Sequence, residues 1–230
     1  MTMNAVSTAA TPEAQSGSCS SSVPFTSGDG YEVYRIPSII RADDGTLVAF
    51  AEGRETRSDA GSIDIVRRRS DDGGCTWGPQ SVVADQGDNT IGNPSPVVDP
   101  RTGDIVLLST RNAGTASEDE ILRGDVPPEH SRRVFVQRST DDGRTFSPLR
   151  EITPTAKRAD WRWYATGPGH SIALTRGEHR GRLVVPANHS SAPPAGSPDT
   201  GEEDKYYGAH SLISDDGGRT WRIGFSDDSF

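Results

Sequence analysis

The sequence lacks several features that would place the protein in other functional classes. No apolar run approaches the roughly 18 residues that a membrane helix needs, so we expect no membrane span. Cysteine occurs only twice, at Cys19 and Cys75, and this indicates neither a metal site nor a disulfide framework. Positive charge is not in excess, because the formal net charge is −9, which argues against nucleic acid as a partner.

The N-terminus also lacks the marks of a secretory signal. Residues from Met1 to about Val23 have neither a basic start nor an apolar core segment. Residues 1–27 are rich in Ser, Ala and Thr, so we expect a disordered leader there and a folded domain over 28–230. The default expectation for location is therefore cytoplasmic, or secreted if the start site is misassigned.

What the sequence does contain favours a β protein with many tight connections, since there are 25 glycines and 16 prolines. An octapeptide of the form Ser-x-Asp-x-Gly-x-Thr-aromatic occurs three times, and we call each copy a box. The three boxes span Ser70–Trp77, Ser139–Phe146 and Ser214–Trp221. Three copies with this many shared positions indicate an internal repeat.

Each box follows a similar series of short strand patterns. The pattern just before the box covers 63–69, 134–138 and 210–213, and a glycine followed by an apolar run lies upstream each time. A further short strand, near a proline in the first two copies, precedes that run. Four short antiparallel strands per repeat are typical of a β-propeller blade, so the sequence predicts an all-β propeller.

The box itself reads as a structural turn. Its Asp can accept hydrogen bonds from backbone N–H groups, and its Gly can adopt a positive φ where the chain reverses. Asp-Asp-Gly also suggests a calcium loop, but the alternating oxygen ligands and final Glu of an EF-hand are missing. We therefore expect a packing role for the boxes and no metal.

The box matches the Asp box, or bacterial neuraminidase repeat, and further motifs narrow the resemblance. Tyr34-Arg35-Ile36-Pro37 resembles the "RIP" motif of sialidases, and Ala51-Glu52-Gly53-Arg54 and then Asp59 follow in the family's order and spacing. The chain thus resembles the N-terminal half of a six-bladed sialidase propeller, with about three of six four-stranded blades. The resemblance covers about residues 28–230.

The resemblance implies roles for four residues. Arg35 and Arg54 would belong to an arginine triad that binds the substrate carboxylate, and Asp59 would be the general acid/base. Asn93, in Asn93-Pro94-Ser95-Pro96, would lie near the substrate pocket. A carboxylic acid in the role of Asp59 needs a raised pKa, which implies a loop that closes over it with substrate bound.

The same resemblance implies an exo-α-sialidase that needs no cofactor and acts on sialylated glycoproteins, gangliosides and oligosaccharides. The family's tyrosine nucleophile, its activating glutamate and the remaining arginines belong to later blades. We therefore expect a truncated form that is inactive alone.

Other residues have plainer interpretations. The run Arg67-Arg68-Arg69 reads as a solvated or ion-paired face, with Glu52 and Asp64 as partners. The aromatic residues Trp161, Trp163 and Tyr164 read as core packing. Glu118 and Glu120 fall where the family can place a pocket acid, while Asn188 and Ser190 replace tyrosines that animal relatives use against the sugar's glycerol tail.

Two alternatives stay open. One is a non-catalytic Asp-box propeller that binds a glycan or a protein, and the other is a relative that transfers sialic acid or acts on its deaminated form. Arg35, Arg54 and Asp59 in family order favour the enzyme over the binding module.

Overall fold

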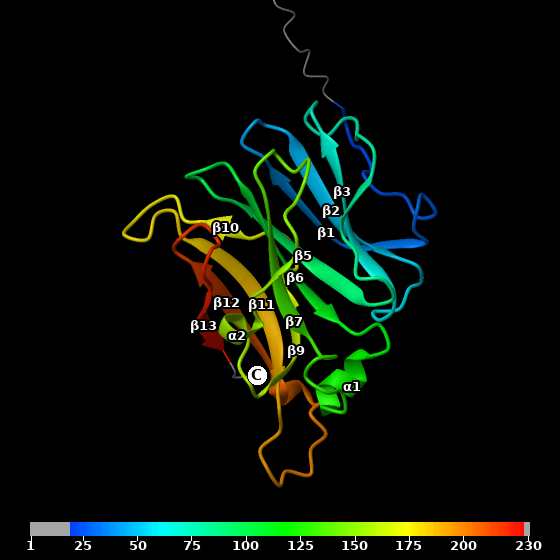
Figure 1. Cartoon of the computed structure of the whole chain (residues 1–230), viewed down its shortest axis with the longest axis vertical. Coiled ribbons are helices and arrows are strands. Elements are labelled where there is room, and N and C mark those ends of the chain that lie inside the picture. Colours follow the sequence, from blue (N-terminus) through cyan, green and yellow to red (C-terminus); the bar gives the residue numbers. More distant parts are fainter. Residues whose placement is uncertain (1–18, 228–230) are drawn as a thin grey trace, which may run out of the picture.

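The computed structural model describes residues 19–227 and shows an all-β fold (Figure 1). Within that range the helices are short: α1 (Glu118–Arg123), α2 (Thr153–Ala156) and a single 3-10 turn (Asp204–Tyr206). The all-β class is therefore confirmed. Closure into a propeller and the number of blades stay predictions.

The strands form three antiparallel units that repeat one order. Unit 1 comprises β1 (Val33–Arg41), β2 (Leu47–Arg54), β3 (Ile63–Ser70) and β4 (Ser81–Ala84). Unit 2 comprises β5 (Thr90–Val98), β6 (Ile105–Asn112), β7 (Arg133–Ser139) and β8 (Arg150–Glu151). In unit 3, β9 (Trp161–Thr166) and β10 (Ile172–Ala173) both pair with β11 (Leu183–Ser191), and β12 (Tyr207–Ser214) and β13 (Arg222–Asp227) follow.

Apolar side chains from consecutive units pack face to face. One cluster joins unit 1 to unit 2 and includes Phe50, Ile65, Ile91 and Leu107. A second cluster joins unit 2 to unit 3 and includes Leu108 and Tyr164. Burial of apolar side chains between consecutive units therefore holds the units together.

Each box lies on an equivalent turn, between the last two strands of its unit. In the second box, Asp141 accepts hydrogen bonds from the Thr145 backbone N–H (2.9 Å) and hydroxyl (2.6 Å), and the Gly143 N–H donates to the Ser139 hydroxyl (2.9 Å). The first and third boxes repeat these bonds through Asp72 and Asp216. The structural interpretation of the box agrees with this geometry.

Two arginines of β3 form ion pairs, as the ion-paired interpretation predicted, although with other partners than Glu52 and Asp64. Arg68 pairs with Asp29 (2.5 Å), and Arg69 lies 3.7 Å from Asp44 and from Asp71. The guanidinium of Arg69, the residue before the first box, donates to the backbone carbonyl of Asp142 in the second box (3.0 Å). Arg138, the residue before the second box, donates in the same way to the carbonyl of Gly217 in the third. Two equivalent arginines thus link consecutive units.

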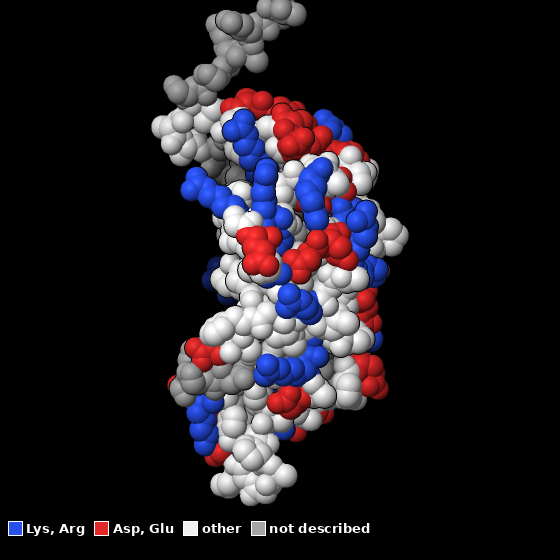
Figure 2. Space-filling view, turned by 90° about the vertical axis from the view of Figure 1, so that its left-hand side faces the viewer, with Lys and Arg blue, Asp and Glu red and all other residues white. Residues whose placement is uncertain are grey.

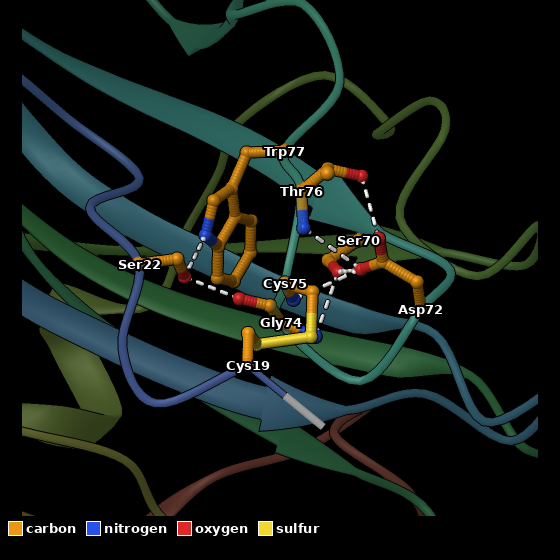
Figure 3. The surroundings of a disulfide bond; sticks show 8 residues. All are labelled: Cys19, Ser22, Ser70, Asp72, Gly74, Cys75, Thr76 and Trp77. Atoms are coloured by element: carbon orange, nitrogen blue, oxygen red, sulfur yellow. Dashed lines mark hydrogen bonds between the residues drawn. A yellow bond between two sulfur atoms is a disulfide. The ribbon is translucent and has the colours of Figure 1, made fainter. Parts of the chain in front are cut away.

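The prediction from cysteine was wrong, because Cys19 and Cys75 form a disulfide (Figure 3). The number of cysteines alone could not predict this disulfide. The two residues lie 56 positions apart and meet only because the N-terminal segment crosses the first box. Beside the disulfide, the Trp77 indole N–H donates to the Ser22 hydroxyl (2.9 Å), which donates to the Gly74 carbonyl.

The expected disordered leader, 1–27, lies partly outside the described residues, which begin at Cys19. Its last nine residues are described, and the structure places them against unit 1. Besides the disulfide, the ring of Phe25 stacks on that of Tyr34, with centroids 5.2 Å apart. We call residues 19–31 the strap.

Figure 2 shows a face on which acidic and basic side chains are interspersed. They gather mainly in its upper part. Neither sign forms a continuous field on this face.

Candidate active site

The long connections lie at the ends of the units opposite to the boxes. There the structure forms a cavity of about 230 Å³, lined among others by Arg54, Asp59 and Asn93. Arg54 ends β2, Asp59 lies in the connection 55–62, and Asn93 is on β5. Arg35, on β1, lies beside this cavity and bonds to Asp59. All four residues that the sequence singled out therefore come together.

Asp59 is held between two guanidinium groups. Its Oδ1 accepts hydrogen bonds from Arg35 Nη1 and Arg54 Nη1, both at 2.7 Å. Partial burial would raise the pKa of Asp59, but the hydrogen bonds and charges of Arg54 and Arg35 outweigh it and hold the pKa below its ordinary value. Without substrate, the pKa of Asp59 is therefore lowered, whereas a general acid needs a raised pKa.

Arg54 is fixed from behind by Glu52. The side chain of Arg54 is 3% exposed, and its Nε (2.8 Å) and Nη2 both donate to one oxygen of Glu52. The other Glu52 oxygen accepts the backbone N–H of Asn93 at 2.7 Å. One buried carboxylate thus orients a guanidinium of unit 1 and a backbone turn of unit 2 together. Asp64 instead accepts the Tyr31 hydroxyl (2.6 Å) and pairs with none of the arginines of β3 in the bonds observed.

A left-handed residue precedes a proline at the equivalent place in each unit. These residues are Ile36 (φ 51°), Asn93 (φ 54°) and Gly167 (φ 81°). Register shifts in β1 and β5 accompany the first two. A positive φ is costly for a β-branched residue such as Ile36, and strain of this kind concentrates at functional sites. The bulges of β1 and β5 thus lie at Ile36 and Asn93, both of which line the cavity.

Arg132 lines this cavity too, and sequence reasoning missed it. It is 4% exposed, donates to Asn93 Oδ1 and Thr110 Oγ1 (both 3.0 Å), and lies 3.8 Å from the ring centre of Trp163. Burial lowers the pKa of Arg132 to about 10. Its sequence signal is weak, because it is one of two consecutive arginines before a strand, a pattern common on surfaces.

The remaining candidates divide between pocket and core. Asn188 and Trp163 line the cavity, whereas Trp161 and Tyr164 are buried in the core as predicted. Burial raises the pKa of Glu118, which is close enough to feel the charge of Arg132. Glu120 instead caps its own helix, α1, by accepting the Ser117 N–H and hydroxyl.

Within residues 19–227, no group of three or more His, Cys, Asp or Glu side chains is arranged to hold a metal ion. The same residues include no helix that is long and apolar enough to cross a membrane.

Comparisons with known proteins agree on one family. A family model described as a BNR repeat-like domain matches residues 45–230. The chain is 35% identical over 192 residues to an exo-alpha-sialidase of Aspergillus fumigatus, covering 76% of this chain and 46% of that protein. It is 36% identical to a sialidase of Micromonospora viridifaciens (85% and 29% covered) and 33% identical to sialidase-2 of Mus musculus (85% and 51% covered).

Solved structures show the same likeness. The chain superposes on the Hadza microbial sialidase Hz136 with a TM-score of 0.72 and 26% identity, covering 87% of this chain and 39% of that one. It superposes on a leech intramolecular trans-sialidase with a TM-score of 0.74, covering 92% and 46%; at 17% identity this shows the fold alone. The chain spans about half, or less, of the length of the relatives it matches.

Proposed function

This chain belongs to the sialidase family and carries its BNR repeats. We propose that it forms part of an exo-α-sialidase, an enzyme that removes terminal α-linked sialic acid from glycans. The substrates would be sialylated glycoproteins, gangliosides and oligosaccharides. One observation carries the proposal: Asp59 lies between Arg35 and Arg54 at the edge of a small polar cavity.

The two arginines suit the carboxylate of sialic acid. A guanidinium group keeps its charge at any physiological pH and can bind a carboxylate through two parallel hydrogen bonds. Without substrate, Asp59 accepts hydrogen bonds from both guanidinium groups. A substrate carboxylate would take its place on Arg35 and share Arg54, while Glu52 keeps Arg54 in position.

The same exchange would prepare Asp59 for acid catalysis. Loss of its bonds to the arginines removes what holds its pKa down, and a neighbouring substrate carboxylate raises the pKa further by like-charge repulsion. Asp59 would then donate a proton to the leaving glycosidic oxygen and later take one from water. We propose a retaining reaction in which a tyrosine is the nucleophile.

We assign that tyrosine, its glutamate and the remaining arginines to later units of a closed six-unit propeller, of which units 1 to 3 form the first half. Residues 1–230 tested alone are accordingly expected to release no sialic acid.

The test measures sialic acid release from 3′-sialyllactose by a complete six-unit protein that contains residues 1–230, with and without Arg35→Lys. The variant should lose about 2 kcal/mol of transition-state binding, roughly a thirtyfold fall in kcat/KM, because lysine cannot form the paired bonds. Unchanged kinetics would remove Arg35 from substrate binding, and a complete six-unit protein that contains residues 1–230 and releases no sialic acid would refute the proposed activity.

A further inference from the structure

A second and larger cavity adjoins the candidate active site. It measures about 750 Å³ and lies between the segment 124–133, which follows α1, and the connection 151–162, which leads from β8 into β9. Arg132 lines both cavities, so it is the wall between them. The proposed catalytic chemistry makes no use of this second cavity.

The second cavity is strongly basic although the protein is acidic. Its charged lining residues are five cations and two carboxylates: Arg132, Arg133, Lys157, Arg158 and Arg162 against Glu129 and Glu151. With Lys157 protonated, the lining therefore carries a formal excess of three positive charges, in a chain whose formal net charge is −9. Positive charge concentrated in a concave, partly buried site attracts anions far more effectively than charge spread over a surface.

The hydrogen bonds of Lys157 and Arg162 leave the positive charges of these two residues uncompensated. Lys157 Nζ donates to the backbone carbonyls of Arg132 and Arg162, both at 2.8 Å, and an ammonium group has a third proton to give. Arg162 Nη1 likewise donates to two carbonyls, those of Leu122 (2.7 Å) and Thr200 (3.1 Å). Carbonyl oxygens satisfy donors but bring no formal negative charge.

The carboxylates of the lining do not balance these cations. Glu151 is already taken by Arg133, whose Nε and Nη2 donate to its two oxygens at 2.8 and 2.5 Å. Glu129 is exposed. Trp161 lines the cavity as well, although it is only 3% exposed. The cavity thus offers hydrogen-bond donors and positive charge together.

From this geometry we propose that the second cavity binds a small organic carboxylate through Lys157 and Arg162. A bare ion would need only a small part of 750 Å³, a volume typical of sites for small organic molecules. Ile121, Val126 and Pro154 supply apolar wall for the uncharged part of such a ligand.

The lowered pKa of Lys157 is consistent with an anion-binding site without a bound anion. Burial, and then the charge of Arg132, lower the pKa of Lys157 to about 7. A bound carboxylate would stabilise the ammonium form, so binding near neutral pH takes up protons. The other charged groups that line this cavity are Arg133, Arg158, Arg162, Glu129 and Glu151.

The experiment is calorimetric titration of the natural protein with sodium glucuronate, sodium sulfate and glucose. Glucuronate should bind more tightly than sulfate, and glucose should not bind. Lys157→Gln and, independently, Arg162→Gln should each weaken glucuronate binding about tenfold or more. The chain's second lysine, Lys205, does not line the cavity, so Lys205→Gln should leave the affinity for glucuronate unchanged.

Arg35→Lys separates this site from the catalytic one, because it should leave glucuronate binding intact. Circular dichroism and the unfolding midpoint establish that each variant is folded. Glucuronate binding that disappears in Arg35→Lys but survives in Lys157→Gln would place the ligand in the other cavity and overturn the proposal. No binding of glucuronate, or equal binding of glucose, would overturn it as well.

Discussion

Asp59 would change role when substrate displaces it from its ion-pair partners. In the structure it is an ion-pair partner of Arg35 and Arg54, and as a general acid it must leave them. Asp59→Ala should lower kcat/KM for sialyllactose by about a hundredfold or more, since its leaving group needs a proton. An aryl sialoside, whose leaving group hardly needs one, should lose much less. Equal losses on both substrates would contradict the acid role.

Glu52 has a positioning role that differs from that of Asp59. Removing one partner of a buried ion pair leaves the other charge uncompensated, so Glu52→Gln should cost about 3 kcal/mol in the free energy of unfolding. It should also raise KM through the loosened Arg54. The exposed Glu55→Gln, three residues away, is the matched control in urea unfolding. A Glu52 variant as stable as this control would contradict the role.

Lys157 should make stability depend on pH. Its pKa is about 7 in the folded chain against an ordinary value of 10.5, so the unfolded chain binds more protons between these values. Stability should therefore rise from about pH 7 toward 10. Unfolding midpoints over this range should lose that slope in Lys157→Met and keep it in Lys205→Met. A slope that survives in Lys157→Met would have another origin.

At the scale of elements, the disulfide fastens the strap to the first box. It closes a loop with a sequence separation of 56, for which chain entropy predicts about 4 kcal/mol of stabilisation. Replacing both cysteines by serine, or reducing the protein, should lower the unfolding free energy toward that extent. Reductant should have no effect on the double variant. Thiols that react with iodoacetamide before any reduction would contradict the pairing.

The first strands of the units show why the RIP motif needs its residues. Pro37 and Pro94 each follow a left-handed residue at a break in strand register, and the bulge aligns Arg35 and Asn93 with the cavity. Proline favours extended backbone in the residue before it, so the left-handed conformations of Ile36 and Asn93 must be held by the surrounding structure.

At the scale of the whole molecule, unit 3 exposes apolar surface. A cavity of about 380 Å³ on its face is lined by residues that include Ile172 and Phe225, which are 52% and 71% exposed. Exposed apolar surface of this kind favours association. Light scattering of residues 1–230 should therefore show association that Phe225→Ser reduces. Val23→Ser, at an equally exposed residue of the strap, should not reduce it. A monodisperse monomer would contradict this prediction.

Much of this protein could be predicted from local sequence. The boxes determine their own turns, because Asp141 and its equivalents bond to groups within four residues. Asp59 and Arg54 are five residues apart on one connection, so their contact is also nearly local. Such features depend on short-range hydrogen bonding and backbone preference, which sequence patterns record directly.

Other features depended on which units pack together. Glu52 meets Asn93, Arg69 meets Asp142 and Cys19 meets Cys75 only after distant segments are brought side by side. Arg132 and Lys157 acquired their altered pKa values in the same way, because burial by neighbouring elements removes water from a charge that is ordinary in an isolated strand. Tertiary packing decided these contacts and charge states, because no local sequence pattern indicates which distant segments will meet.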